Sequence, residues 1–595
     1  MRIKSKKSGQ SKERVSRRVT KAANEFGERA GKHFSERFVR RLPNIHEVRL
    51  WVVEWVILVL VVFLLAIVQN IWYGESYETE AFVKGGDYSE ATLGKISSMN
   101  PLYATTSSEK VLARLLFANI VSPDSTGHLK HELADTIVAD ETKKVWTLKL
   151  RDDLHWSDGE KITADDVVYT VGLIVDSSAK TTIAVNFTNV KVEKKDELTT
   201  VFTLPSPYTD FEDTLEFPLV PAHILGEISP ALVYESNFST HPIGSGPFVL
   251  NVLQSATATS TNMQTVYLNR NEKYFKSAAK LDSFTLKTYE NSKQILEAMR
   301  NSDVMATAEL AQEEASELPD SVSRKNTLIN GGAFAFLNTT SSKLSNVKVR
   351  QAIQRGVNME KVRKDIDDSQ ILDYPILQRQ EDLKMPDLGE YNLEEAKKLI
   401  VDAGLKYKDD QIVDNNGKQV MLNISVPQRD VLTKVAERFG EQLERLGFGV
   451  VLNAYDEAKA STDFFSAVVR MRDYDILIYE VDLGVSADPF VYYSSLQASG
   501  SGWNFSNYSN GLADDALISA RTTTNAKLRK TKFESFLKRW TQDVPSIGLY
   551  QSTMTYCHMP NVQIYSENSE LTDVLDRFSD VQNWASRRIN VNMTP

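Results

Sequence analysis

Residues 144–171 read KVWTLKLRDDLHWSDGEKITADDVVYTV and predict a strand, a tight turn and a helix in direct succession. Apolar and other side chains alternate over 145–150, the period of two that indicates a strand with one buried face. The run Ser157-Asp158-Gly159 favours a turn, because Asp and Ser bond their own backbone and Gly accepts positive φ. Thr163 and Asp166 then form the capping box of a helix. Alternating strands and helices indicate an α/β fold.

Length and charge divide the chain further. Its 595 residues exceed one ordinary core, so we expect two or three core-forming units. Residues 1–50 carry 15 Lys or Arg against 5 Glu, a balance of +10 in a chain whose net charge is −10, so the remainder carries −20. This asymmetry predicts a basic tail and an acidic body in different environments. The single cysteine, Cys557, excludes an intramolecular disulfide and a multi-cysteine metal site.

Residues 51–73 predict a transmembrane helix. The run from Val56 to Val68 is wholly apolar, and with its flanks it reaches the roughly 20 residues that span a bilayer. Aromatic residues stand at both ends, and positive charge precedes the segment. We therefore predict a single-pass signal anchor in the cell membrane, with a cytoplasmic tail (1–50), a linker (74–84) and an extracellular or periplasmic body. A cleaved signal peptide is the alternative.

The basic tail allows two interpretations. Its apolar residues, from Val15 to Leu42, have helical spacing, so the tail could lie on anionic membrane lipids as an amphipathic helix. Equally, it could be a disordered signal that retains the N-terminus inside the cell. Nucleic-acid binding is the rival interpretation of a basic run, and we do not expect it beside a membrane helix.

The stretch 144–171 is similar to a signature of the extracytoplasmic solute-binding proteins that serve ABC importers of the oligopeptide, dipeptide and nickel class (family 5). Other segments resemble the same family in the same order, among them Asn100-Pro101-Leu102, the glycine-rich Ile243–Leu250 and Asp488-Pro489. The resemblance extends almost continuously from about residue 83 to residue 565. The chain is thereby identified as a member of that family with an N-terminal membrane anchor.

The resemblance implies a two-lobed periplasmic-binding-protein-like fold of type II, with an extra subdomain, preceded by one transmembrane helix. Lobe I would comprise residues 81–115, 241–330 and 550–595, and the extra subdomain residues 116–240. Lobe II would comprise residues 331–549. The chain would then cross between the lobes twice, and the lobes would close on a ligand by a hinge motion.

No catalytic or metal-binding constellation is visible in the sequence. The run His131-Glu132-Leu133-Ala134-Asp135 begins like a zinc-protease motif but ends in Asp, so the second imidazole ligand is missing. Gly244-Ser245-Gly246 lacks the frame of a nucleophile elbow and favours a turn. Eight scattered histidines and one cysteine make no metal cluster. We therefore expect neither an enzyme nor a cofactor.

Ligand-binding candidates come from the segments that the family places at its cleft, where aromatic walls and a few polar groups hold a solute. They are Asn100, Tyr103, Asp482, Tyr492, Trp503, Tyr550 and Thr553. Peptide-binding relatives carry an Asp three positions before the Asp-Pro pair, where it pairs with the α-amino group of the peptide. Val485 occupies that position here, so Asp482 would have to replace it.

Two functions from different classes remain open. The first is a membrane-anchored, monomeric receptor that captures a peptide or similar small solute and delivers it to the permease subunits of an ABC transporter. The alternative is an ectodomain with degenerate binding lobes that acts in protein–protein interaction or signalling. A search for ligand-induced stabilisation separates the two.

Overall fold

The structure is a computed structural model of the chain. It describes residues 45–592 apart from 125–126, 180, 182–186, 188, 256–261, 367–369, 378–381, 456–463, 487, 499–501 and 566–570. Two compact units are present, and each is described by itself: residues 1–81 with 589–595, and residues 82–588. The amphipathic helix expected in the basic tail lies outside the described residues.

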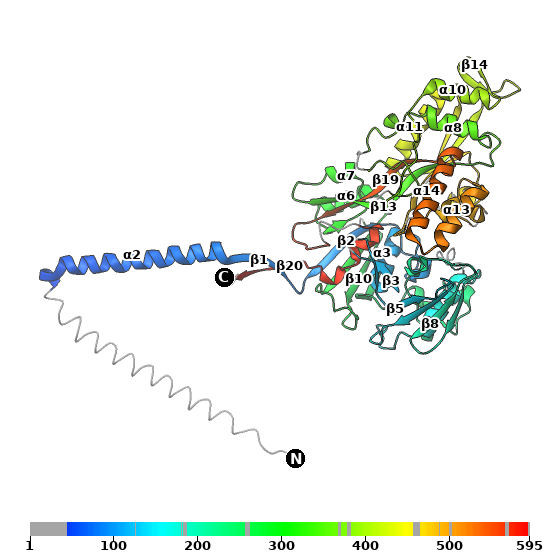
Figure 1. The fold of residues 1–595 in the computed structure, drawn as a ribbon. Coiled ribbons are helices and arrows are strands. Elements are labelled where there is room, and N and C mark those ends of the chain that lie inside the picture. The colour runs from blue at the N-terminus through cyan, green and yellow to red at the C-terminus, as the bar shows by residue number, and fades with distance from the viewer. Residues whose placement is uncertain are drawn as a thin grey trace. The chain divides into compact units, whose positions relative to one another are not determined.

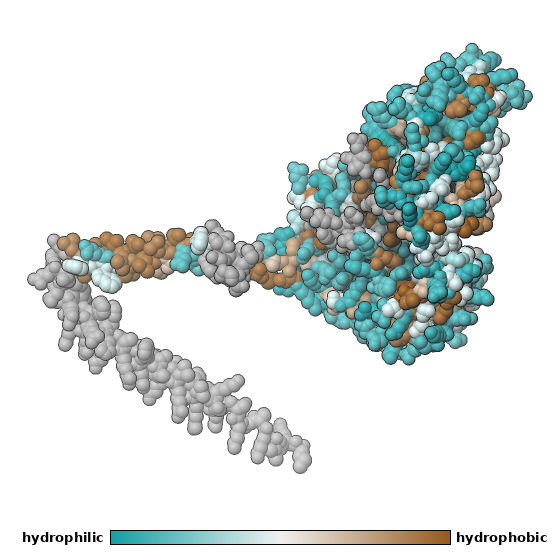
Figure 2. All heavy atoms as spheres, viewed as in Figure 1, coloured by the Kyte–Doolittle hydropathy of each residue, from teal (hydrophilic) through white to brown (hydrophobic). Residues whose placement is uncertain are grey.

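The first unit is dominated by helix α2 (Ile45–Tyr77). Its segment Leu50–Trp72 has a mean hydropathy of 2.9, and none of it is buried against other parts of the protein. Figure 2 shows hydrophobic side chains along the described part of this helix. By length and composition the segment can cross a membrane, and a signal sequence has the same properties. Within the expected linker, α2 continues to Tyr77 and strand β1 (Glu78–Val83) follows, paired with β20 (Arg587–Asn592).

The second unit is organised around one ten-stranded mixed sheet (Figure 1). In spatial order its strands are β17 (Gly449–Tyr455), β16 (Met421–Pro427), β18 (Ile476–Asp482), β13 (Ser323–Leu337), β19 (Ser546–His558), β12 (Ala306–Thr307), β2 (Asp87–Leu93), β11 (Ser283–Tyr289), β10 (Gln264–Arg270) and β9 (Phe248–Ser255). The long central strands β13 and β19 are antiparallel neighbours.

Smaller sheets and helices surround this sheet. The strands are β3 (Val121–Pro123) with β4 (Leu129–His131), β14 (Lys406–Lys408) with β15 (Gln411–Val413), and a side sheet of β5 (Ala134–Ala139), β6 (Val145–Leu150), β8 (Thr199–Thr203) and β7 (Lys191–Lys194). The helices are α3 (Ser107–Leu116), α4 (Ala164–Val175), α5 (Ala222–Leu225), α6 (Ser292–Arg300), α7 (Gln312–Ser316), α8 (Val347–Gly356), α9 (Met359–Val362), α10 (Leu393–Asp402), α11 (Asp430–Leu446), α12 (Phe490–Tyr493), α13 (Gly511–Thr522) and α14 (Ala526–Asp543).

Hydrophobic cores define two lobes at the two ends of the main sheet. The first lobe packs β2 and β9–β12 with α3, α6 and α7, and its core continues into the side sheet with α4, which we call the subdomain. The second lobe packs β16–β18 with α8–α14. Strand β19 belongs to both lobes, because Leu549 is buried in the second-lobe core and Tyr556 in the first-lobe core.

The stretch that opens the sequence argument folds as predicted. In β6 (145–150) alternate residues are buried, and Trp156 at the turn is fully buried. Gly159 has a φ of +108°, the left-handed conformation that favours glycine. The backbone N–H of Thr163 donates to Asp166 at 2.8 Å, which closes the capping box of α4. This signature is therefore part of the scaffold of the subdomain.

The glycine-rich segment is also confirmed as a place of close approach. A Cβ atom added at Gly244 would lie 2.0 Å from the backbone oxygen of Leu116. At Gly246, an added Cβ would lie 2.6 Å from the backbone oxygen of Leu115. Because no side chain fits these gaps, the two chain segments can meet only through glycine.

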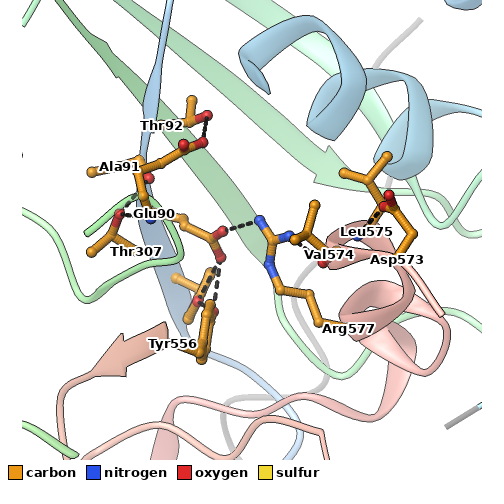
Figure 3. A network of polar contacts seen from close by, with 11 residues as sticks. Glu90, Ala91, Thr92, Thr307, Tyr556, Asp573, Val574, Leu575 and Arg577 are labelled. Atoms are coloured by element: carbon orange, nitrogen blue, oxygen red, sulfur yellow. Dashed lines mark hydrogen bonds and ion pairs between the residues drawn. The ribbon is translucent and has the colours of Figure 1, made fainter. Parts of the chain in front are cut away.

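A buried polar network joins the C-terminal segment to the first lobe (Figure 3). Arg577 Nη2 donates to Glu90 Oε1 at 2.7 Å, and the two side chains are only 2% and 0% exposed. The hydroxyls of Tyr88 and Tyr556 each donate to Glu90 Oε2 at 2.9 Å. Arg577 Nη1 donates to the Val574 carbonyl at 2.5 Å. The buried carboxylate is thus compensated, as burial of a charge requires.

Candidate functional site

The crossing between the lobes is irregular in β13. Its register with β19 shifts between Leu328 and Gly332, so the strand bulges where it passes from one lobe to the other. A Cβ atom at Gly332 would lie 2.8 Å from the backbone oxygen of Tyr550 and 2.2 Å from the Leu372 side chain, which leaves no room for a side chain. Within the bulge, the Asn330 carbonyl accepts from Leu483 N at 2.7 Å, and Asn330 N donates to the Thr572 carbonyl at 2.9 Å. The bulge therefore joins the end of β18 to the C-terminal segment.

Asp482 is the last residue of β18, opposite Gly331 of β13. Its side chain is exposed to water. Nevertheless, loss of hydration under surrounding protein and the charges of Asp573 and Asp576, opposed by Lys110, together raise the pKa of Asp482 to about 8. The charges that act on Asp482 therefore come from the C-terminal segment and from α3. We call the surroundings of Asp482 and of the carboxylates that interact with it the acidic recess.

Further carboxylates share this recess. Burial and the charges of Asp576, Asp573 and Asp482 raise the pKa of Glu216 well above its usual range, although the Glu216 side chain is exposed. Burial, together with Asp573, raises the pKa of Asp576 to about 7. These four carboxylates come from the second lobe, the subdomain and the C-terminal segment. They repel one another when ionised, which favours the protonated forms of Asp482, Glu216 and Asp576 near neutral pH, and a bound cation would favour their ionised forms.

Cations of the first lobe also act on these carboxylates. Arg114 on α3 donates to Glu132 at 3.2 Å, and Lys276 lies 2.6 Å from the same carboxylate. Although burial opposes the shift, the two cations lower the pKa of Glu132 to about 2, so this carboxylate neutralises much of their charge. Lys110 remains as an exposed cation beside Asp482. Among the described residues, no three His, Cys, Asp or Glu are grouped to hold a metal ion.

The carboxylates of Asp573 and Asp576 belong to a turn that is fixed to the protein core. Asp573 and Asp576 form a capping box on a 3₁₀ helix, Val574–Phe578, with Asp576 accepting from Asp573 N at 2.8 Å. Arg577 belongs to the same turn and is tied to Glu90 in the core (Figure 3). The buried ion pair therefore positions the acidic edge of the recess.

Three of the predicted residues lie on or beside the strands at the crossing. Tyr492 is 7% exposed, and its hydroxyl donates to the Asp482 carbonyl at 2.6 Å. The Tyr550 hydroxyl donates to Glu480 at 3.2 Å. Thr553 is half-buried, and its hydroxyl accepts from Gln370 Nε2 at 2.9 Å. The structure thus brings Tyr492 and Asp482 together and gives Tyr550 and Thr553 polar partners of their own.

The other three lie in other surroundings. Asn100 is fully buried and caps a 3₁₀ turn through Oδ1, which accepts from Leu102 N at 3.1 Å, while its Nδ2 has no hydrogen-bond partner among the described residues. Tyr103 is 6% exposed and packs edge-on against Tyr234, with ring centroids 5.2 Å apart, and within the described part of the chain its hydroxyl has no hydrogen-bond partner. Trp503 is half-buried against aromatic residues of the second lobe. Their part in ligand binding stays a prediction.

A cavity of about 220 Å³ lies elsewhere, in the second lobe. Its walls include Arg363, Tyr391 and Trp540, and none of the seven predicted residues lines it. The Arg363 guanidinium donates to the carbonyls of Leu549 and Gly548, so these hydrogen-bond donors are already used by strand β19. We therefore take the acidic recess, and not this cavity, as the candidate site.

Sequence reasoning missed Glu216, Asp573 and Asp576. Glu216 follows a short 3₁₀ helix and belongs to no pattern. The spacing of Asp573 and Asp576 is that of a capping box, which predicts a helix start and not a cleft. Only folding brings these carboxylates to Asp482.

Comparisons with known proteins agree with this architecture. Residues 128–504 match the family model described as bacterial extracellular solute-binding proteins, family 5 (middle). The oligopeptide-binding protein AppA of Bacillus subtilis is 24% identical over 495 residues, which cover 78% of this chain and 86% of AppA.

Solved structures share the fold. The structure of Bacillus subtilis AppA in complex with a nonapeptide is similar at a TM-score of 0.71 and 22% identity, covering 85% of this chain and 100% of that one. NikZ of Campylobacter jejuni in complex with Ni(L-His) gives a TM-score of 0.69 at 21% identity, covering 84% and 99%. The two-lobed fold with its subdomain is thus shared by proteins crystallised with chemically different ligands.

Proposed function

The chain belongs to the bacterial extracellular solute-binding proteins of family 5, and from that membership we propose that it is a membrane-anchored receptor for peptides or similar small solutes. Members of this family are the solute-binding components of ABC importers and are not enzymes. In this proposal the ligand sits between the lobes, which the chain joins near residues 330 and 549, and is then delivered to the permease subunits. Lobe I would keep the bounds 81–115, 241–330 and 550–595.

The acidic recess is the observation that supports this function. When a ligand cation binds, the exposed Asp482 and Glu216 can release their protons and accept hydrogen bonds from it, and their poor hydration strengthens such bonds. A peptide carries such a cation at its α-amino group and on basic side chains. We infer that Asp482 takes the role that Val485 leaves open, and that the ligand bears an amine or guanidinium group.

Helix α2 supports the anchor. Its apolar segment Leu50–Trp72 is long enough to span hydrocarbon, and the positive charge of residues 1–50 favours a cytoplasmic N-terminus. Fractionation with protease protection tests this topology. We expect the body to be digested from outside intact cells and to stay with the membrane fraction. A body released into the medium would indicate cleavage of the segment.

A thermal-shift screen of the full-length chain in detergent tests the ligand class. A ligand at 100 times its Kd adds about 2.7 kcal/mol of stability. We expect amine-bearing peptides to stabilise the protein, and the Asp482→Asn variant to weaken their binding by about tenfold, the ordinary cost of losing one charge-assisted hydrogen bond. Asp152→Asn, an exposed turn carboxylate of the subdomain, is the matched control.

The outcomes separate the two candidate functions. Stabilisation that Asp482→Asn and Asp152→Asn leave equally strong would place the ligand elsewhere in the protein. The absence of any shift with peptides or other small solutes would favour the ectodomain with degenerate lobes over the receptor.

A further inference from the structure

The subdomain touches the second lobe at a place distant in sequence from the β13–β19 crossing. Residues 208–213 of the subdomain contact Ser486, Asp488 and residues 521–529 of the second lobe. The backbone N–H of Thr209 donates to the Arg521 carbonyl at 2.8 Å, and its hydroxyl donates to the Thr523 carbonyl at 3.2 Å. Direct backbone bonding between the two parts shows a specific fit and not a loose apposition. We call this contact the clasp.

Arg521 is the centre of the clasp. Its guanidinium lies between the rings of Tyr208 from the subdomain and Phe490 from the second lobe, 4.1 Å from each centroid. Arg521 Nε donates to Asp488 Oδ2 at 2.5 Å, and the Tyr208 hydroxyl donates to the same oxygen at 3.3 Å. Asp488 of the Asp-Pro pair is thus occupied by the clasp.

A second ion pair spans the same contact. Arg529 on α14 holds Asp210 with both terminal nitrogens, at 2.7 Å and 2.6 Å. The two side chains are 14% and 15% exposed, so water reaches both of them. Because both charges regain hydration when they separate, such a pair is cheaper to break than a fully buried one.

We propose that the clasp holds the two sides of the ligand cleft together and sets how often the unliganded protein closes. The strands β13 and β19 join the lobes covalently and act as the hinge, whereas the clasp is made only of reversible contacts. A hinge motion that separates the subdomain from the second lobe has to break them. Weakening the clasp therefore shifts the population toward the open form, and apparent ligand affinity falls with the closed fraction.

The surroundings of Asp213 agree with this role. Its carboxylate accepts a hydrogen bond from the Ser486 hydroxyl across the contact. Burial and the charges of Asp210 and Glu212, opposed by the Ser486 hydrogen bond and by Arg529, together raise the pKa of Asp213 to about 7. A carboxyl that loses hydration on closure is neutralised more readily in the closed form.

Pulsed electron–electron double resonance, which measures the distance between two spin labels, tests the proposal on the full-length chain in lipid nanodiscs without added ligand. Spin labels go on Val138→Cys in the subdomain and Leu512→Cys on α13, positions that are 60% and 63% exposed. Burial raises the pKa of the native Cys557 to about 11, so this thiol resists labelling. We expect Arg529→Gln and Arg521→Met each to raise the open-to-closed ratio at least threefold, the effect of losing one partly hydrated ion pair.

Three further variants make the result specific. Asp210→Asn combined with Arg529→Gln should open the protein no more than the single changes, because both remove the same pair. Ser486→Ala deletes one hydroxyl and should act in the same direction even if a larger change prevents folding. Arg270→Gln is the matched control, since Arg270 is 17% exposed and pairs with Glu272 at 2.8 Å within one lobe.

Two results would overturn the clasp. One is a distance distribution in Arg529→Gln, Arg521→Met and Ser486→Ala that equals the wild type. The other is an equal opening in Arg270→Gln. Because no ligand is present, either result is independent of which solute the cleft binds.

Discussion

Arg577 and Arg529 both bind a carboxylate, at 2.7 Å from Glu90 and 2.6 Å from Asp210, and they differ in their access to water. The first pair is 2% and 0% exposed and lies inside one lobe. The second is 14% and 15% exposed and joins the subdomain to the second lobe. A dry pair cannot separate without leaving a charge unsolvated, whereas a wetted pair exchanges its partner for water. An arginine–carboxylate pair thus forms a stable buried contact at Arg577 and a reversible contact at Arg529.

The largest effect is expected from Arg577→Met. This change leaves the Glu90 carboxylate buried without its cation, so unfolding should become easier by about 3–5 kcal/mol. Urea unfolding of the full-length chain in detergent, followed by tryptophan fluorescence, measures the loss. Because Arg577 also positions Asp573 and Asp576, binding of amine-bearing peptides should weaken in parallel.

A double variant separates charge from packing at this joint. Combining Arg577→Met with Glu90→Leu removes both charges, and replacement of a buried pair by apolar residues is often neutral. Recovery of at least half of the lost stability is expected. A double variant as unstable as Arg577→Met would show that the loss comes from packing.

Arg529→Gln should lower the free energy of unfolding by about 1 kcal/mol or less, which is much less than Arg577→Met. The reason is that water solvates Asp210 once its partner is gone. The same urea titration measures it beside Arg577→Met. A loss equal to that of Arg577→Met would mean that the clasp is as permanent as the buried pair, contrary to the comparison above.

The smallest effect concerns pH. Because the pKa of Asp213 is raised in the closed form, closure takes up a proton: its contribution is complete below about pH 4 and is lost as pH rises toward about 7. The closed fraction should therefore decline over this window, and the decline should be shallower in Asp213→Asn. Spin-label distances recorded from pH 4 to 8 provide the measurement. Asp482 and Asp576 also titrate near neutral pH, so only the difference between wild type and variant is attributed to Asp213.

Local sequence was enough for the scaffold. The alternation in 145–150, the Gly159 turn and the Thr163 cap act within a few residues, where backbone preference and one hydrogen bond decide the conformation. The close approach at Gly244 could be predicted for a similar local reason, because a residue without a Cβ lets another chain segment come near. The apolar segment of α2 was readable from its length alone.

Tertiary structure alone decided the site and the clasp. Asp482 and Asp576 are almost a hundred positions apart, and no local pattern distinguishes a carboxylate in a recess from one on an open surface. Asp488 carries the family signature, yet only the fold shows that Arg521 and Tyr208 occupy it. The physical reason is that hydration and long-range charge depend on what surrounds a group in space. Sequence by itself therefore determined the family, the local elements of the lobes and the apolar helix. The tertiary structure determined which charged side chains contact one another and which of them remain accessible to water.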